Sequence, residues 1–440
     1  MSLRWIVCAV SLGGLLFGFD AGVISGCEEA IQGEFGLSPF WHGLVVAGAL
    51  IGTVFGALGS GWMCDKFGRK PTLVCMGGLF LVSAIGCALT PGRCFDSPDS
   101  TATYGVVGPQ VLGWMRFIGG IAIGGVSVAV PMYIAEIAPP NRRGRLVLVN
   151  QFCIVLGIVV SYVSNYCVAL SGKYSPEVAW RVMLGIECVP AFMYLAALVR
   201  VPESPLWLRM AEDGSSEQIM AMRDGRSRAP SRAVSSAPLF VRRNMRPLLL
   251  CFTVAFFSQL SGVNVVNYYS PRIFRMIFGE GSELASLAGT IGVGVVNLLF
   301  TVLAFFLIDR FGRRKLLISG CFTMAAMHGL IAWQISLGSA CVPWLAMLGV
   351  YGFIAAVAFS ASAVIWVFIS EIFPPDVRAK GQAFGGMVHW VMCMAVSWLF
   401  PVAVAHTGTF AFAFFAAMML IEAVWAIFVM PETKGTSIID

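Results

Sequence analysis

Residues 65–71 read DKFGRKP, and residues 309–315 read DRFGRRK. Two more pairs of motifs follow in the same order: EIAPPNRRG at 136–144 with EIFPPDVRA at 371–379, and PES at 202–204 with PET at 431–433. The members of each pair are separated by a little more than half of the chain. Three motifs that recur in one order indicate a duplication, so we expect two related halves joined by a linker.

The composition indicates the solvent for which the chain is built. Hydrophobic residues make up 58% of the sequence and charged residues only 12%, whereas soluble domains average about 25% charged residues. A chain with so few charges cannot cover itself with polar surface, so we expect a lipid bilayer around it. The basic residues form no dense patch with interleaved aromatic residues, which argues against a nucleic-acid partner.

Twelve apolar segments approach or exceed the roughly 20 residues that a bilayer span requires. They lie at residues 4–25, 41–63, 71–90, 106–134, 146–170, 180–201, 247–270, 283–308, 315–337, 342–369, 381–405 and 409–430. Each must be an α-helix, because hydrocarbon offers the backbone no hydrogen-bond partners. The predicted fold class is an all-α membrane protein with twelve transmembrane helices in two pseudo-symmetric six-helix halves. We expect the halves at residues 1–201 and 247–430, a cytoplasmic linker at 202–246 and a short tail at 431–440.

Basic residues concentrate in alternate connections between these spans. Most of the lysine and arginine residues outside the spans lie near residues 64–70, 139–145, 200–246, 309–315 and 378–380. The positive-inside rule places these connections, and with them both termini, in the cytoplasm. We expect the plasma membrane as the location.

The chain has 13 cysteines, and most of them lie inside apolar spans, where they act as small apolar side chains. Cys27 and Cys94 lie in polar connections, and a disulfide between them stays open. No pair of cysteines with zinc spacing and no nucleophile–base pair stands out. We therefore expect no metal, no cofactor and no enzymatic activity. The first apolar run has full spanning length and lacks a cleavage site, so we expect no cleavable signal peptide.

One acid lies in the middle of the first apolar run, in LGGLLFGFDAGVISG at 12–26. A charge at the centre of a bilayer costs at least ~2.5–3.5 kcal/mol, so Asp20 needs a partner. The run 113–125 contains Arg116, which would be equally costly alone, and we expect the two to pair. The pair either takes part in proton movement or fixes helix packing as a static ion pair. Glu422, inside the last span, is expected to be structural.

Five stretches of the chain together resemble the sugar porter branch of the major facilitator superfamily. They are the loop with Gly61, Asp65, Gly68, Arg69 and Lys70; PMYIAEIAPPNRRG at 131–144; WRVMLGIECVPA at 180–191 with PESPLWL at 202–208; QLSGVNVVNYYS at 259–270; and PETKG at 431–435. The resemblance covers nearly the whole chain and implies the major facilitator fold. It also implies monosaccharide transport by alternating access.

The resemblance to proton-coupled members implies that Asp20 and Arg116 carry the proton coupling, with help from Glu187. Passive members have a neutral residue in place of the acid, so we expect a symporter whose partners are a monosaccharide, a proton and the lipid bilayer. A passive sugar uniporter, a polyol transporter of the same fold and a non-transporting sugar sensor stay open. The sequence does not indicate which sugar is carried or the oligomeric state.

Six residues match the sugar ligands of the family: Gln151, Gln259, Asn264, Asn297, Trp366 and Trp390. Amides suit sugar hydroxyls, and an aromatic ring suits the apolar sugar face. Gln259 and Asn264 are about 140° apart around a regular helix, so both can border a cavity. The amides could instead bond between helices, and the tryptophans could be ordinary packing.

Several positions depart from the family pattern or have a second interpretation. Ser258 stands where a first glutamine is usual, and His389 stands where amides are common. Ser362 and Ala363 replace a glycine and a proline, so we expect the span at 342–369 to be less broken. Tyr268 and Tyr269 belong either to an outer gate or to the core.

The repeated motifs combine acids with arginines where helices meet the predicted cytoplasmic surface. Such pairs can close an inner gate, although the same loops could serve only to set the topology. Tight turns at Gly68 and Gly312 fit both alternatives. The candidate gate residues are Asp65, Arg69, Glu136, Arg143, Glu203, Asp309, Arg313, Glu371, Arg378 and Glu432.

Overall fold

A computed structural model of the chain describes residues 2–92, 101–139, 142–209, 238–279, 281–374 and 376–434. Every regular element in these ranges is helical. Twelve helical segments in them are long and apolar enough to cross a membrane, so the twelve-span prediction is confirmed. The linker between residues 210 and 237, Cys94 and the last six residues of the tail lie outside the described ranges.

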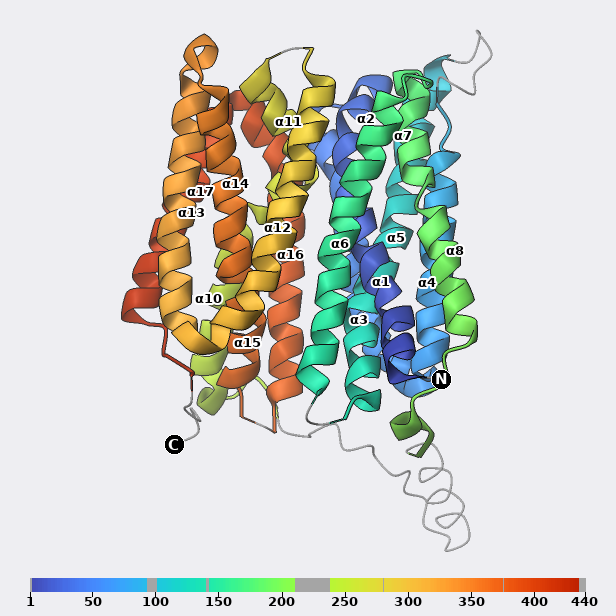
Figure 1. The fold of residues 1–440 in the computed structure, drawn as a ribbon, viewed down its shortest axis with the longest axis vertical. Coiled ribbons are helices and arrows are strands. Elements are labelled where there is room, and N and C mark those ends of the chain that lie inside the picture. The colour runs from blue at the N-terminus through green and yellow to red at the C-terminus, as the bar shows by residue number, and fades with distance from the viewer. Residues whose placement is uncertain are drawn as a thin grey trace, which may run out of the picture.

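The first six spans form one bundle, shown from blue to green in Figure 1. Its helices are α1 (Leu3–Val23) with the short η1 (Ile24–Gly26), α2 (Glu28–Phe35), α3 (Pro39–Phe67), α4 (Arg69–Ala88), α5 (Thr101–Ile137), α6 (Arg143–Leu170), α7 (Pro176–Gly185) and α8 (Cys188–Val199). The helix α2 is an addition to the predicted spans, and it lies in the connection after the first span.

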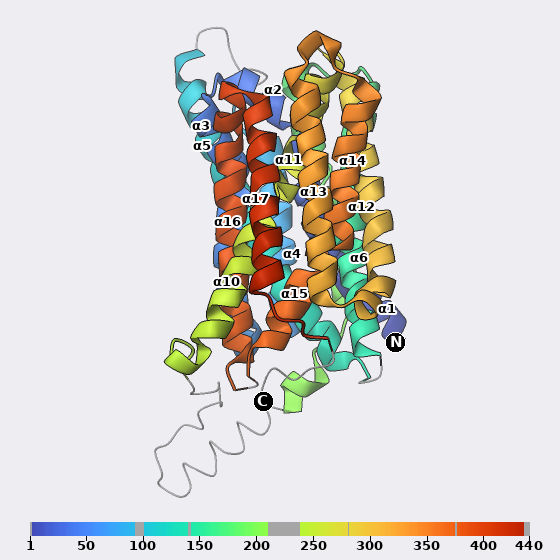
Figure 2. The ribbon, with the colours of Figure 1, turned by 90° about the vertical axis from the view of Figure 1, so that its left-hand side faces the viewer.

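The last six spans form the second bundle, which lies beside the first (Figures 1 and 2). Its helices are η3 (Arg242–Asn244), α10 (Met245–Leu260), α11 (Val263–Phe278), α12 (Glu283–Phe311), α13 (Arg313–Ser336), η4 (Gly338–Ala340), α14 (Pro343–Phe359), α15 (Ala361–Ile372), α16 (Arg378–His406) and α17 (Gly408–Phe428). The boundaries at residues 201 and 247 stay predictions.

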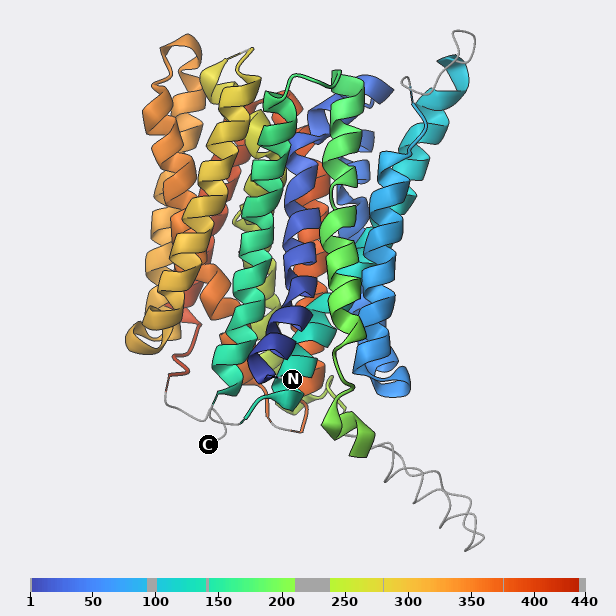
Figure 3. The same cartoon turned by 45° about the vertical axis from the view of Figure 1, so that its right-hand side comes forward.

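The two ends of the bundle differ in what they carry. The helix α1 begins and α17 ends at the same end, which also carries the DKFGRKP and DRFGRRK loops (Figures 2 and 3). We call it the basic end. The helix α2 and the C-terminal part of α11 lie at the opposite end of the bundle (Figure 1).

Small residues bring the helices of the first half close together. A Cβ atom on Gly52 of α3 would lie 2.0 Å from the carbonyl oxygen of Phe117, and one on Gly120 of α5 would lie 1.9 Å from that of Ala49. Only glycine permits this approach, which is how apolar helices gain contact where lipid gives no hydrophobic drive. The same device joins the halves, because a Cβ atom on Gly43 would lie 2.0 Å from the carbonyl oxygen of Trp398.

Three spans are divided inside the bundle. Gly262, with a φ of 80°, separates α10 from α11, and the span of α7 and α8 is divided just before Cys188. The span at 342–369, for which the sequence predicts a less broken helix than in the family, is divided at Ser360 between α14 and α15. The Ser360 hydroxyl donates to the carbonyl oxygen of Ala356 at 2.6 Å, and it lies against Gly320, where a Cβ atom would be 1.9 Å away.

The helix α11 is bent where Pro271 lies inside it. Proline has no N–H, so it cannot satisfy the carbonyl group of Asn267 one turn earlier. Tyr162 of α6 donates its hydroxyl to that carbonyl oxygen at 2.8 Å. The kink in the second half is therefore stabilised by a hydrogen bond from the first half.

Candidate functional site

Asp20 and Arg116 meet inside the first half. Asp20 is fully buried near the end of α1, and Arg116 of α5 is 2% exposed. The guanidinium Nη1 donates to Oδ1 of Asp20. The structure thus brings together the charged residues of the first and fourth spans, which pack against each other, away from lipid.

A second acid lies within electrostatic range of this pair. Glu187 is 2% exposed, at the division between α7 and α8, and it interacts with the charges of both Asp20 and Arg116. Oδ2 of Asp20, Nε of Arg116 and Oε1 of Glu187 have no hydrogen-bond partner among the described residues. Two acids and one base thus share a site remote from water, so a proton on either acid would neutralise the cluster.

A polar cluster lies at the break between α10 and α11. Asn264 donates from Nδ2 to Oε1 of Gln259 at 2.7 Å. Nε2 of Gln259 lies 2.9 Å from Nε2 and 3.1 Å from Nδ1 of His389 on α16. On a regular helix the two amides would stand apart, but the turn at Gly262 lets them touch. In this series of hydrogen bonds, the neighbour of each amide determines whether the amide donates or accepts.

Aromatic rings surround the histidine of this cluster. The ring centroid of His389 lies 5.0 Å from that of Trp366 and 5.2 Å from that of Trp390. Oγ of Ser258 lies 3.4 Å from Nδ1 of His389. Trp366 is 45% exposed, so other side chains of the protein do not cover the whole of this ring.

Phe17, which the sequence did not single out, contacts one of these aromatic rings from the first half. Its ring centroid on α1 lies 5.9 Å from that of Trp390 in the other half. Phe17 precedes Asp20 by about one helical turn, so both lie on one side of α1. The signal that could have identified it was an aromatic residue one turn before the membrane acid.

The remaining candidate ligands form no hydrogen bond with this cluster among the described residues. Gln151 of α6 is exposed, and Asn297 of α12 is half-buried and accepts from Oγ1 of Thr301 at 3.3 Å. Tyr268 and Tyr269 are buried, and the Tyr269 hydroxyl donates to the carbonyl oxygen of Ser397 at 3.1 Å. Tyr269 thus ties α11 to α16 within the second half.

The three repeated motifs form one network in the first half, at the basic end. Arg69 donates from Nη2 to Oε1 of Glu136 at 2.7 Å and from Nη1 to Asp65 at 3.3 Å. Ser204 donates its hydroxyl to Oε2 of Glu136 at 2.5 Å. Glu203 accepts the backbone N–H of Arg69 at 3.0 Å. Each motif thus supplies a partner to the other two.

The second half repeats this network. Arg313 donates from Nη2 to Glu371 at 3.0 Å, and the hydroxyl of Thr433 donates to Oε2 of the same carboxylate at 2.5 Å. Glu432 accepts the backbone N–H of Arg313 at 2.9 Å. The duplication therefore extends to individual hydrogen bonds, and the interactions join helices within a half.

The glycines of both loops are required by this arrangement. Gly68 and Gly312 have φ of 107° and 85°, which favours glycine. A Cβ atom on Gly68 would also lie 2.4 Å from Oε2 of Glu203, and one on Gly312 would lie 2.7 Å from Oε2 of Glu432. Each glycine thus makes room for the carboxylate that caps the next helix.

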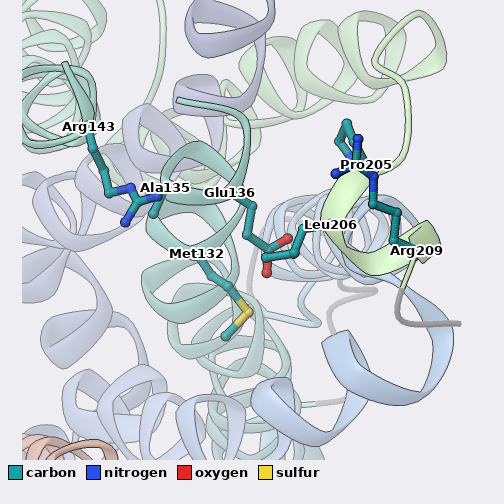
Figure 4. Close-up of a pocket in the computed structure, with 7 residues that line it drawn as sticks. All are labelled: Met132, Ala135, Glu136, Arg143, Pro205, Leu206 and Arg209. Atoms are coloured by element: carbon teal, nitrogen blue, oxygen red, sulfur yellow. The ribbon is translucent and has the colours of Figure 1, made fainter. Parts of the chain in front are cut away.

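A surface pocket at the basic end contains two of the candidate gate residues. Glu136 and Arg143 border it together with Met132, Ala135, Pro205, Leu206 and Arg209 (Figure 4). Arg143 is exposed and forms no ion pair with the described residues. Arg378, in the second half, donates to the carbonyl oxygen of Phe373 at 3.4 Å and to no other described residue. The side chain of Asp309 lies outside the described part of the chain.

The fold has twelve spans in two halves, and polar residues lie where spans are broken inside the bundle. This combination is typical of a membrane carrier. The family model "Sugar (and other) transporter" matches residues 5–440, and the chain belongs to this family. It is an integral, multi-pass membrane protein.

Two relatives and one solved structure show how near the likeness is. The chain is 36% identical to the D-xylose-proton symporter of Escherichia coli (strain K12), over 98% of this chain and 94% of the relative. It is 34% identical to the arabinose-proton symporter of Bacillus subtilis (strain 168), over 98% and 93%. The inward open conformation of the xylose transporter XylE from E. coli matches with a TM-score of 0.84 at 33% identity, covering 99% of this chain and 98% of that chain.

The carboxylate cap of the second half gives a test by stability. Burial raises the pKa of Glu432, but backbone N–H groups of Lys434, Arg313, Arg314 and Thr433 lower it more, so the pKa lies below its usual 4.5. This stabilisation is present above pH 4.5 and is lost as the pH falls through the lower pKa of the folded state. We expect Glu432→Gln to lower the melting temperature at pH 7 by roughly 2 °C, measured by thermal unfolding in detergent.

The matched control is Asp376→Asn, which removes an exposed ion pair with Arg243 at the same end. Such pairs contribute little, so its melting temperature should stay near that of the wild type. Equal effects of the two substitutions would contradict the capping role.

Proposed function

We propose that the chain is a proton-coupled monosaccharide symporter that works by alternating access. The observation that carries the proposal is the placement of Asp20 and Phe17 on one face of α1. The carboxyl that meets Arg116 thereby shares a helix with a ring that contacts Trp390, which lies beside His389 of the polar cluster. The names of the two relatives, a D-xylose-proton and an arabinose-proton symporter, support the same reaction.

The proposed sugar site is the polar cluster at the α10–α11 break. Asn264, Gln259 and His389 form hydrogen bonds with one another. Sugar hydroxyls donate and accept, so they can replace each of these bonds without leaving an amide unsatisfied. The rings of Trp366 and Trp390 offer apolar faces to the sugar ring.

Further ligands are proposed from the other half and from neighbouring helices. An exposed amide inside a bilayer span must face water or a ligand, which assigns Gln151 to the cavity side of α6. We assign Asn297 and Ser258 to the same cavity, and Tyr268 and Tyr269 to its outer boundary.

The proton step follows from the charges around Asp20. While the carboxylate is ionised, its attraction to Arg116 holds α1 against α5. A proton on Asp20 removes this attraction and lets α1 shift, carrying Phe17 with it relative to the sugar site. Glu187 lies within electrostatic range and can share the proton. Sugar binding and proton binding are then linked through one helix.

The orientation is proposed from the charges of the loops. The basic end faces the cytoplasm by the positive-inside rule, and both termini lie there. We assign the plasma membrane as the location. The ion-pair networks at this end would stiffen each half, and the exposed Arg143 and Arg378 would supply contacts between the halves when the inner side closes.

Replacing the proton-carrying acid should separate exchange from accumulation. We expect Asp20→Asn to exchange labelled D-xylose across proteoliposomes but to lose accumulation driven by a pH gradient, because a neutral amide cannot release a proton. The measurement is uptake of labelled D-xylose with and without an imposed pH step.

The control for this experiment is Glu422→Gln, which neutralises a different buried acid, on α17. It should accumulate D-xylose as the wild type does. Continued uphill accumulation of D-xylose by Asp20→Asn would mean that another group carries the proton. A wild type that exchanges D-xylose but never accumulates it would indicate a uniporter.

Removing the central amide should weaken sugar binding. Gln259→Ala deletes one donor and one acceptor of the cluster, and two lost hydrogen bonds predict about a tenfold rise in the dissociation constant. Calorimetric titration with D-xylose in detergent measures it. The matched control is Gln334→Ala, which removes a buried amide of α13 that accepts from the backbone N–H of Val342 and should leave the dissociation constant unchanged. Equal binding by Gln259→Ala and the wild type would exclude Gln259 from the site.

A further inference from the structure

Charged residues from both halves meet at the end opposite the basic end, outside the sugar and proton sites. Arg272 in the second half of α11 donates from Nε to Oε1 of Glu28 at 3.0 Å and from Nη2 to Oε2 at 2.6 Å. Nη2 also donates to Oε1 of Gln32 at 2.6 Å. Beside them, Arg275 lies 2.7 Å from Glu29. Because α2 belongs to the first half and α11 to the second, these contacts join the halves (Figure 1).

A third helix closes this cluster from the side of the first half. Nε2 of His42 on α3 lies 2.7 Å from Oε2 of Glu28, and both side chains are fully buried. The Arg272 guanidinium lies 6.0 Å from the ring centroid of Tyr269, and that ring lies 6.3 Å from His42. Glu28 thus binds a group from each half, and the side chain of Arg272 is only 16% exposed.

The energetics of such a pair depend on what happens when it breaks. A buried two-point contact between arginine and carboxylate is strong, and removing one partner alone leaves a costly buried charge. If the halves separate at this end, however, both partners regain water together. A buried pair that joins two moving bodies can therefore form and break reversibly. The Glu34–Arg181 pair at 2.8 Å joins α2 to α7 inside the first half and does not face this choice.

The helix α11 relates this cluster to the sugar site. Asn264 lies in the first turn of the helix, at the polar cluster, and Arg272 lies about two turns further on, past the kink at Tyr269 and Pro271. Held at Arg272, the part of α11 beyond the kink stays against the first half. Released there, it can swing away at the kink without disturbing α10.

We propose that Arg272 is a positioning residue which, through Glu28, holds α11 against the first half and closes the outer side of the carrier. We call the four residues Glu28, His42, Gln32 and Arg272 the outer latch. The inference rests on the proposed function for its meaning in transport. The strength of the latch then sets the fraction of carriers that are open to the outside.

The test measures sugar affinity from each side of the membrane. An apparent dissociation constant equals the intrinsic value divided by the fraction of carriers in the competent state. Arg272→Gln should therefore lower the half-saturation for labelled D-xylose exchange from the outside at least threefold and raise it from the inside. Right-side-out and inside-out vesicles give the two values. Arg272→Lys keeps the charge but loses the two-point contact, so it should fall between Arg272→Gln and the wild type.

Two further variants separate the latch from a general loss of structure. Arg181→Gln breaks the buried pair inside the first half, so it should lower the melting temperature without changing the ratio of the two half-saturations. Glu28→Gln should change that ratio in the same direction as Arg272→Gln, and the double variant should add little to either single variant. Fully additive effects would show that Glu28 and Arg272 act separately.

A second readout does not depend on the substrate. Amide hydrogen exchange in the α11 segment from residue 266 to 278 should be faster in Arg272→Gln than in the wild type and in Arg181→Gln, in the empty carrier. Unchanged exchange, or an unchanged ratio of half-saturations in a folded Arg272→Gln protein, would overturn the latch. If the wild type exchanges no D-xylose, this sugar is not its substrate, and the hydrogen-exchange comparison decides the latch alone.

Discussion

The ion pair between Asp20 and Arg116 governs how the first half is built. Neither charge could remain alone in hydrocarbon, so α1 and α5 must bring them together, and the small residues along α5 allow this approach. Gly119 lies beside the pair, where a Cβ atom would be 2.8 Å from Oδ2 of Asp20. A bulkier residue there would displace the carboxylate from the guanidinium. The same charge that demands the pairing is the one that a proton can cancel, so structure and proposed mechanism share one constraint.

A single helix transmits the state of this pair to the rest of the molecule. The helix α1 carries Asp20 toward Arg116 and Phe17 toward Trp390, and its continuation at η1 and α2 carries Glu28 to Arg272. The proton site, the sugar cluster and the outer latch are thus connected along the first 28 residues of the chain. A rocking motion of the halves would change the two contacts that cross between them, Phe17 with Trp390 and Glu28 with Arg272. Because the helix that makes these contacts also carries Asp20, the proton site and the moving contacts are mechanically connected, as coupled transport requires.

The sequence predicted more of the fold than of the contacts at the helix breaks. The apolar run lengths and the repeated motifs were sufficient for twelve spans in two halves, and the cost of a buried charge was sufficient to pair Asp20 with Arg116. A regular helix could not predict that Gln259 and Asn264 touch, because the turn at Gly262 is a tertiary feature. The division at Ser360 was missed for a similar reason: it depends on packing against Gly320 of another helix. The outer latch was also missed, since Glu28 and Arg272 are far apart in the chain and no local pattern joins them.

The most direct test of the account is the movement of protons caused by sugar. Proteoliposomes that contain the wild-type chain and a pH-sensitive dye are given D-xylose in a weakly buffered medium, without an imposed pH gradient. If Asp20 carries a proton inward with each sugar, the outer medium becomes alkaline, with about one proton taken up per sugar in this account. Sugar entry with no change in external pH would contradict symport and leave the buried ion pair with a structural role only.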